Sequence, residues 1–151
     1  MATVRVTRGS RSRIPGTTVG VQVSTFGLDR LETISGSEME PICREAIEPA
    51  RELVAGEWPI DTGASIDTLR IETDEIGATH CRVSLRIGGP QLIADPRNVK
   101  HIDYAPYIEF NGSPGGTPPG TIAYAMSSQA RLMRSLIHAG VRELIRRKLN
   151  A

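Results

Sequence analysis

The sequence Trp58-Pro59-Ile60-Asp61-Thr62-Gly63-Ala64-Ser65 separates a helical pattern from two strand-like patterns. Before it, Ser37-Glu38-Met39-Glu40 matches the S-x-x-E capping box that begins a helix. Gly56 and Pro59 predict where that helix ends. Pro41 is tolerated in the first turn, whereas Pro49 predicts a kink or a break. The apolar residues at helical spacing are Ile42, Ala46, Ile47, Ala50, Leu53 and Val54.

Two strand-like patterns follow this segment and predict a hairpin. Residues 65–76 form the first pattern, residues 79–87 form the second, and Glu75-Ile76-Gly77-Ala78 supplies the turn. In the second pattern apolar and polar residues alternate, which predicts a half-buried strand with a basic outer face. Its inward positions are Cys81, Val83, Leu85 and Ile87, and its outward positions are His80, Arg82, Ser84 and Arg86. Residues 19–23 alternate in the same way and predict a further strand.

The C-terminal third predicts one more strand and the longest helix. Residues 104–110 are expected to be a third strand of the sheet, and residues 123–149 a helix whose last turn carries Arg146, Arg147 and Lys148. Gly and Pro mark residues 88–103 and 111–120 as loops. The apolar face of the helix consists of Met126, Leu132, Met133, Leu136, Ile137, Val141, Leu144 and Ile145.

These patterns together predict an α+β fold. A small antiparallel or mixed sheet is packed against one helix in the N-terminal half and one long C-terminal helix. We divide the chain into a basic arm, residues 1–18, and a single α+β domain, residues 19–151. The arm either contacts phosphate or an acidic partner surface, or is a plain tail. Its basic residues are Arg5, Arg8, Arg11 and Arg13.

Charge is distributed unevenly along the chain, although the net charge is +1. Residues 1–28 hold four basic and no acidic residues (+4), residues 29–80 hold four basic and 13 acidic (−9), and residues 81–151 hold ten basic and four acidic (+6). Such segregation either drives head-to-tail attraction between copies or ends as a mixed solvated surface after folding. The sequence contains no run of 18 apolar residues, so no membrane span is expected. The N-terminus shows no apolar signal region, so no secretion signal is expected.

The tripeptide Asp61-Thr62-Gly63 has two interpretations. It matches the catalytic segment of an aspartic protease, and small viral proteases obtain their second Asp by dimerising. Asp61 nevertheless follows the end of a helix, where a protease would have an apolar strand. The alternative is a structural turn, in which the Asp61 carboxylate accepts a backbone N–H two residues on and Gly63 adopts a positive φ. We favour the turn.

Two further observations concern possible binding chemistry. Glu109 lies within an apolar stretch, so it either pairs with a cation of the C-terminal helix or points to water from an edge strand. Cys43 and Cys81 are expected to be free thiols, and a zinc site that combines them with two His is the alternative. The sequence has no P-loop, Ser elbow or H-E-x-x-H motif, and no cofactor is expected.

In order along the chain, these segments resemble one family, the head–tail joining or tail-completion (neck) proteins of tailed bacteriophages. Residues 58–63 match the helix-to-strand turn of that family, and Asp67-Thr68-Leu69 matches its strand start. The second signature is Tyr104-Ala105-Pro106-Tyr107-Ile108-Glu109-Phe110, followed by a Pro/Gly loop and a long helix. Two departures are Ser65, where the family usually has Leu, and Asn111, which is inserted before Gly112.

The resemblance implies a structural protein of the virion neck with no catalytic site, made in the cytoplasm of the bacterial host. It implies a ring of copies, a hexamer or a dodecamer, that meets other neck proteins and the tail tube. A tail terminator or a head-side stopper ring is the alternative role. Besides its protein partners, such a ring is expected to allow nonspecific contact with DNA in the channel. The interface residues expected on this basis are Arg5, Arg8, Arg11, Arg13, Tyr104, Tyr107 and Glu109.

Overall fold

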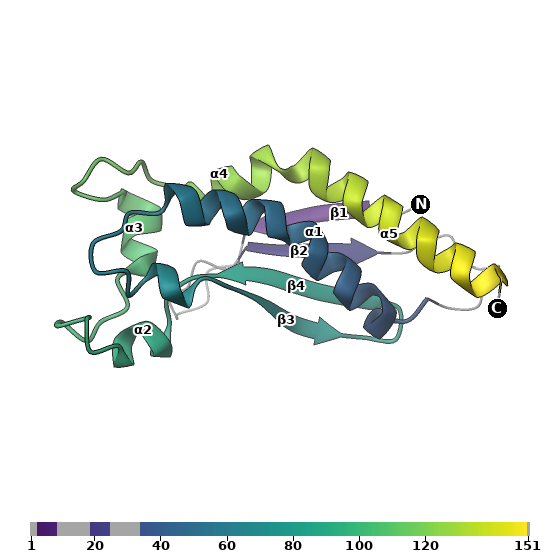
Figure 1. Ribbon diagram of the computed structural model, residues 1–151, viewed down its shortest axis with the longest axis horizontal. Helices are drawn as coiled ribbons and strands as arrows, with labels where there is room; N and C mark the ends of the chain where they lie inside the picture. Colours follow the sequence, from purple (N-terminus) through teal and green to yellow (C-terminus); the bar gives the residue numbers. More distant parts are fainter. Residues whose placement is uncertain (1–2, 9–18, 25–33, 151) are drawn as a thin grey trace.

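A four-stranded antiparallel sheet carries a layer of helices in the computed structural model, which describes residues 3–8, 19–24 and 34–150 (Figure 1). The strands are β1 (Thr3–Arg8), β2 (Val19–Ser24), β3 (Arg70–Ile76) and β4 (His80–Arg86), in the order β1-β2-β4-β3. The predicted α+β class is confirmed, with one early helix and one long C-terminal helix.

The N-terminal segment contributes to the sheet. Residues 3–8 were expected to belong to an arm, but they form the edge strand β1, which pairs antiparallel with β2. The rest of the expected arm, including Arg11 and Arg13, lies outside the described residues. β2 also pairs with β4, with Val21 opposite Val83, so the predicted strand at residues 19–23 is correct. Pairing with β2 is what turns residues 3–8 from a tail into a strand.

The predicted hairpin is present, but its first strand is shorter than expected. Residues 66–68 form the 3-10 helix η1 (Ile66–Thr68), and β3 begins only at Arg70. A bulge at Asp74 shifts the register between β3 and β4. The side chains of Cys81, Val83 and Leu85 are buried as the alternation predicts. The outer face is not simply basic, because Arg86 forms ion pairs with Glu72 and Asp74 of β3.

The capping box of helix α1 (Gly36–Glu57) lies two residues earlier than the predicted box at Ser37 and Glu40. The box that forms is Ser35-x-x-Glu38: the Ser35 hydroxyl accepts the Glu38 N–H at 3.3 Å, and the Glu38 carboxylate accepts the Ser35 N–H at 2.9 Å. The sequence contains two overlapping S-x-x-E matches, and the expectation used the second, at Ser37 and Glu40. Ser37 instead lies inside the first turn.

The break predicted at Pro49 does not occur, because α1 continues through it to Glu57. Proline inside a helix removes one backbone hydrogen bond, so packing must compensate for that cost. Ala46, Ile47, Ala50 and Val54 flank Pro49 and are fully buried. Their burial against the sheet and the C-terminal helices keeps the helix in one piece.

Residues 104–110 are helical, so the prediction of a third strand was wrong. Helix α3 (Ala105–Asn111) has Pro106 in its first turn and ends at Gly112, whose N–H donates to the Ile108 carbonyl at 2.8 Å. Gly112 has a φ of 75°, a backbone conformation that glycine adopts more readily than other residues. The preceding loop contains one further short helix, α2 (Pro90–Ala94).

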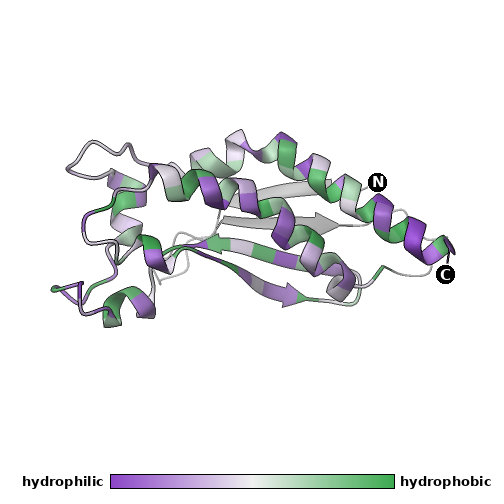
Figure 2. Ribbon diagram, viewed as in Figure 1, coloured by the Kyte–Doolittle hydropathy of each residue, from purple (hydrophilic) through white to green (hydrophobic). Residues whose placement is uncertain are grey.

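The predicted C-terminal helix is present as two helices, α4 (Thr121–Ser128) and α5 (Ala130–Asn150). The interruption is slight, because Gln129 still donates to the Ala125 carbonyl and accepts from the Met133 N–H. Met126, Met133 and Ile137 are fully buried, as the apolar face predicts. Figure 2 shows that α5 becomes more hydrophilic toward its C-terminus.

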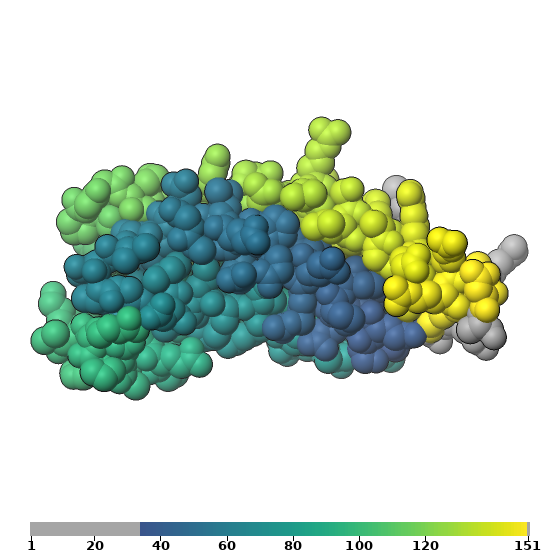
Figure 3. Space-filling view, viewed as in Figure 1, coloured from purple at the N-terminus to yellow at the C-terminus, as the bar shows by residue number. Residues whose placement is uncertain are grey.

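The core lies between the sheet and the helices α1, α4 and α5. α1 packs across β3 and β4, and α4 contacts β1 and β2. α1 and α5 lie side by side and form much of the face seen in Figure 3. The segments α2, α3 and residues 58–65 gather at the opposite end of the molecule from the β3–β4 turn (Figure 1). The largest fully buried side chains are Met39, Ile47, Leu85, Leu92, Ile122, Met126, Met133 and Ile137.

Candidate functional site

The turn after α1 is anchored by two of its buried side chains. The indole N–H of Trp58 donates to the Ser65 hydroxyl at 3.1 Å, and both side chains are buried. Between them, Gly63 has a φ of 79°, which a side chain would disfavour. This hydrogen bond across the turn holds its two ends together, so residues 59–64 form a closed loop at the end of the molecule.

The hydrogen bond expected from Asp61 is made by its neighbour. The Thr62 hydroxyl accepts the Ala64 N–H at 3.3 Å, whereas the expected hydrogen bond was from the Gly63 N–H to the Asp61 carboxylate. The Asp61 side chain is exposed, and within residues 34–150 it has no hydrogen-bond or ion-pair partner. Within one copy, the described residues therefore bring no second carboxylate to Asp61, which an aspartic protease dyad requires.

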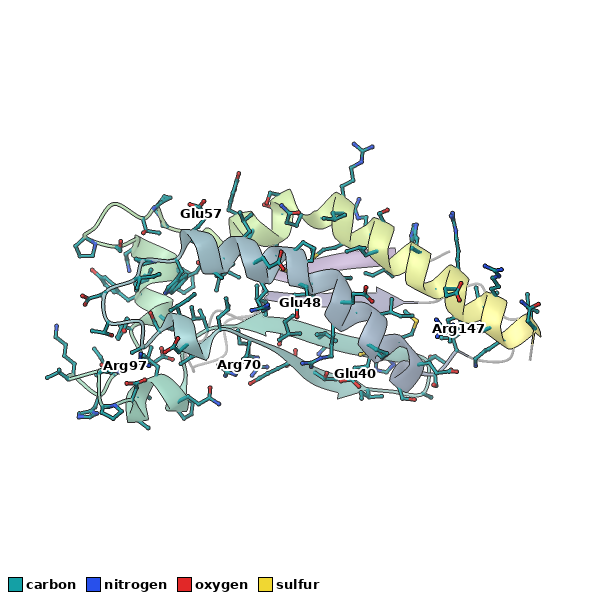
Figure 4. The ribbon with its side chains drawn as sticks, viewed as in Figure 1. Glu40, Glu48, Glu57, Arg70, Arg97 and Arg147 are labelled. Carbon is teal, nitrogen blue, oxygen red and sulfur yellow. The ribbon has the colours of Figure 1, made fainter. Side chains whose placement is uncertain are left out.

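Arg97 links this turn to the segment that follows α2. Its guanidinium forms ion pairs at 2.7 Å with both Asp67 and Asp95, and it reaches the Thr62 carbonyl at 3.5 Å (Figure 4). Hydrogen bonding from Arg97 lowers the pKa of Asp95, and the two carboxylates raise the pKa of Arg97. The three charges therefore hold together two segments about thirty residues apart in sequence.

Two polar side chains brace the loop between β4 and α3. The buried amide of Asn98 donates to the carbonyls of Leu92 and Ile102, at 2.7 and 2.8 Å. The Asp103 carboxylate accepts the Gly89 N–H at 2.7 Å. The predicted loop 88–103 is therefore an internally bonded unit that contains α2, and it can present its outer side chains in fixed positions.

Glu109 has a partner that neither sequence interpretation anticipated. Its side chain is 4% exposed, and its two carboxylate oxygens accept the N–H groups of Ile122 and Ala123, at 2.9 and 3.1 Å. These N–H groups belong to the first turn of α4, where a negative charge also meets the positive end of the helix dipole. The expected pairing with a cation of the C-terminal helix, or exposure to water, is replaced by capping of a helix. Glu109 is thus structural and is not an exposed interface residue.

The other predicted interface residues fall into three groups. Tyr107 is 64% exposed on α3, as an interface residue would be, whereas Tyr104 is half-buried against the core. Arg5 and Arg8 lie in β1, and the structure describes their backbone alone. Arg11 and Arg13 lie outside the described residues. Of the predicted set, Tyr107 is therefore the residue for which the described structure provides an accessible surface.

Several other apolar side chains are exposed on segments at the same end of the molecule as Tyr107, and sequence reasoning missed them. They come from the turn after α1, from α2, from the loop after it and from α3, which all lie at the same end of the molecule (Figure 1). We call this surface the apolar end. It comprises Ile60, Ile93, Val99, Ile102, Tyr107 and Phe110, whose exposure ranges from 40% for Ile93 to 85% for Val99. Exposed apolar side chains that gather in this way are typical of protein–protein contact surfaces.

The cysteines and histidines form no metal site in the part of the chain that the structure describes. Cys43 and Cys81 are free and fully buried, and burial raises the pKa of the Cys43 thiol to about 12. Among residues 34–150, His80 contacts Glu75 and no group of three or more potential ligands comes together. The predicted free thiols agree with this arrangement, and the zinc alternative finds no ligand set among the described residues.

No protein-family model, curated protein or solved structure matches this chain. None of the described helices is both long and apolar enough to cross a membrane.

Proposed function

We propose that the protein is a structural subunit of the neck of a tailed-phage virion, where copies of it form a ring that joins or completes the head–tail junction. It is not an enzyme on this proposal. The observation that carries the proposal is the apolar end, because a chain that exposes Val99, Tyr107 and Phe110 together has surface to bury against a neighbour.

The sequence signatures that resemble the neck-protein family support the same proposal. Residues 58–63 and 104–110 are far apart in sequence, yet both lie at the apolar end (Figure 1). The polar contacts of Arg97, Asn98 and Asp103 stiffen this end. A preorganised surface loses little conformational entropy on association, which suits a subunit that must join a ring.

The proposal is tested with purified protein and purified particles. Native mass spectrometry should find a closed oligomer, with six or twelve copies, and immunogold labelling should place the protein at the neck. Phe110→Asp should weaken association, because it buries a charge at the contact. Ser127→Asp is the matched control, since it adds the same charge at an exposed position of α4. A monomer at all concentrations that is also absent from particles would remove the proposal.

Two other roles are separated by their own measurements. A tail terminator or head-side stopper would form a ring as well, and the neighbour to which it crosslinks in the particle distinguishes these roles. A dimeric aspartic protease would lose peptide cleavage in Asp61→Asn. The position of Asp61 just after the end of α1, where a protease has an apolar strand, favours the structural role over the protease.

A further inference from the structure

The outward side of α5 carries a row of arginines that form no ion pair with the described residues. Their spacing of three, eight and four positions places them on one side of the helix, away from the buried Met133 and Ile137. All are exposed, and none forms an ion pair with the described part of the chain, in contrast to Arg147 and Lys148. We call this row the basic stripe, and it consists of Arg131, Arg134, Arg142 and Arg146.

The neighbouring helix α1 carries a complementary row, the acidic stripe, formed by Glu45, Glu48 and Glu52. These positions are three and four residues apart, on the side of α1 opposite the buried Ile47 and Val54. Glu45 and Glu52 are exposed and have no ion-pair partner among the described residues, while Glu48 pairs with Arg51. Figure 4 shows Glu48 on the helix surface that faces the viewer.

The two stripes do not neutralise each other within one copy. α1 and α5 pack antiparallel, with Lys148 paired to Glu38 at one end of their contact and Gly140 close to Ile42. Among the described residues, no arginine of the basic stripe forms an ion pair with a glutamate of the acidic stripe. Each stripe therefore remains available to an oppositely charged surface of another molecule.

We propose that the basic stripe of one copy docks on the acidic stripe of the next, which makes a head-to-tail contact between subunits. This inference rests on the proposed function and adds a charged contact between subunits to the contact made by the apolar end. The spacing fits: Arg134 and Arg142 lie about 12 Å apart along α5, and Glu45 and Glu52 lie about 10 Å apart along α1, at about 1.5 Å per residue. A contact between two different surfaces of the same chain produces a ring when its rotation closes.

A second copy fits the basic stripe better than nucleic acid does. Phosphate groups would also pair with the arginines, but they would leave the acidic stripe without an oppositely charged partner. A second copy presents its own acidic stripe, so both rows of charge are satisfied by one interaction that repeats from subunit to subunit. Salt should weaken such a contact, because exposed charges are screened over about 10 Å at 0.1 M ionic strength.

Reciprocal charge reversal tests the contact. Variant A is Arg134→Glu with Arg142→Glu, variant B is Glu45→Arg with Glu52→Arg, and variant AB combines all four changes. We expect A and B each to raise the dissociation constant for self-association at least about tenfold, as measured by sedimentation in about 0.1 M salt. A one-to-one mixture of A and B should associate as the wild type does, since each then meets an opposite charge, and AB should associate alone.

Matched variants and independent readouts separate charge from folding. Circular dichroism and urea unfolding should show that A and B remain folded, and the neutral variant Arg134→Gln with Arg142→Gln should associate more weakly than the wild type and more tightly than A. Wild-type association that A and B leave unchanged, or a mixture that fails to restore association, would overturn this contact. The neck assignment would stand in that case if the wild type still forms a ring in particles.

A DNA-binding measurement covers the competing use of the basic stripe. The wild type, with its acidic stripe intact, should bind a short duplex weakly at about 0.1 M salt. Tight binding that A abolishes, with no change in the oligomeric state, would assign the stripe to nucleic acid and overturn the proposal.

Discussion

Glu109 caps a helix that begins 12 residues after it: its Oε2 accepts the N–H of Ile122 at 2.9 Å, and its Oε1 accepts the N–H of Ala123 at 3.1 Å. The residue at the usual capping position, Gly120, has no side chain to do so. The backbone N–H of Gly120 also donates to the Glu109 carbonyl at 2.6 Å. One residue of α3 therefore fixes both ends of the Pro/Gly loop and the start of α4.

Removing this cap should destabilise the protein. Glu109→Gln keeps the shape of the side chain but loses the charge and one acceptor oxygen, so we expect a cost of about 1 to 2 kcal/mol. Glu109→Ala should cost about 2 to 3 kcal/mol, because it also leaves buried N–H groups without a partner. Urea unfolding of purified protein measures both. Glu52→Gln, on the exposed side of α1, should change the free energy of unfolding by less than about 0.5 kcal/mol. If Glu109→Gln and Glu52→Gln changed the free energy of unfolding equally, the capping role of Glu109 would be contradicted.

Periodicity was sufficient to predict the elements with many buried positions. The buried alternation of Cys81, Val83 and Leu85 identifies β4. The buried apolar residues of α1 recur from Met39 to Val54, which is enough to outweigh Pro49. The start of α1 was misplaced by two residues because two S-x-x-E matches overlap. Local sequence alone does not say which serine, Ser35 or Ser37, has the extended backbone of a cap.

The elements that sequence reasoning missed depend on distant contacts. Residues 104–110 contain aromatic and β-branched residues that favour a strand, yet the segment is helical, ends at Gly112 and caps another helix through Glu109. The apolar end was missed for a related reason. Val99, Tyr107 and Phe110 lie on separate segments, and whether such residues are buried or exposed is decided only when those segments come together.

The turn after α1 should be sensitive to its backbone and not to its carboxylate. Gly63→Ala places a side chain at a φ of 79°, which should cost about 1 to 2 kcal/mol. Asp61→Asn should change stability by less than about 0.5 kcal/mol, because Asp61 is exposed and Thr62 makes the hydrogen bond of the turn. Thermal or urea unfolding of the two variants provides the comparison. If Asp61→Asn lowered the free energy of unfolding more than Gly63→Ala does, the Asp61 carboxylate would be the group that stabilises the turn.

Acid should remove the contribution of Glu38 to stability. The N–H of Ser35, the ammonium of Lys148 and the hydroxyl of Ser35 lower the pKa of Glu38 from 4.5 to about 2. A carboxyl whose pKa is lower in the folded state stabilises that state above the unfolded pKa and loses this effect as pH falls toward the folded pKa. Glu38→Gln should therefore be less stable than the wild type at pH 7, and the difference should shrink between pH 4.5 and about 2.

The control for this pH dependence is Glu45→Gln, because Glu45 is exposed and has no ion-pair partner among the described residues. Its difference from the wild type should stay small and nearly constant over the same range. Urea unfolding at several pH values measures both variants. A gap between wild type and Glu38→Gln that is unchanged at pH 3 would show that the carboxylate does not stabilise the start of α1.

The two cysteines should be chemically silent in the folded protein. Cys43 and Cys81 are fully buried, and burial raises the pKa of both thiols, that of Cys43 to about 12. Alkylation needs an accessible thiolate, so iodoacetamide at pH 8 should leave the native protein unmodified and should modify both residues after unfolding. Ser37→Cys, at an exposed position, should react under native conditions and confirms that the reagent is active. Mass spectrometry counts the modified thiols, and rapid native modification of either would contradict their burial.

Two glycine-to-alanine substitutions should have opposite effects on stability. A Cβ on Gly140 would lie 2.6 Å from Cγ2 of Ile42, at the contact between α5 and α1, whereas a Cβ on Gly56 would meet nothing within 4 Å. Alanine raises helix propensity at both positions, so Gly56→Ala should stabilise the protein by about 0.5 to 1 kcal/mol. Gly140→Ala should destabilise it by about 1 to 3 kcal/mol, because the packed helices must separate. In the double variant with Ile42→Ala the loss caused by Gly140→Ala should largely disappear, and additive losses in that double-mutant cycle would mean that Gly140 and Ile42 are not in contact.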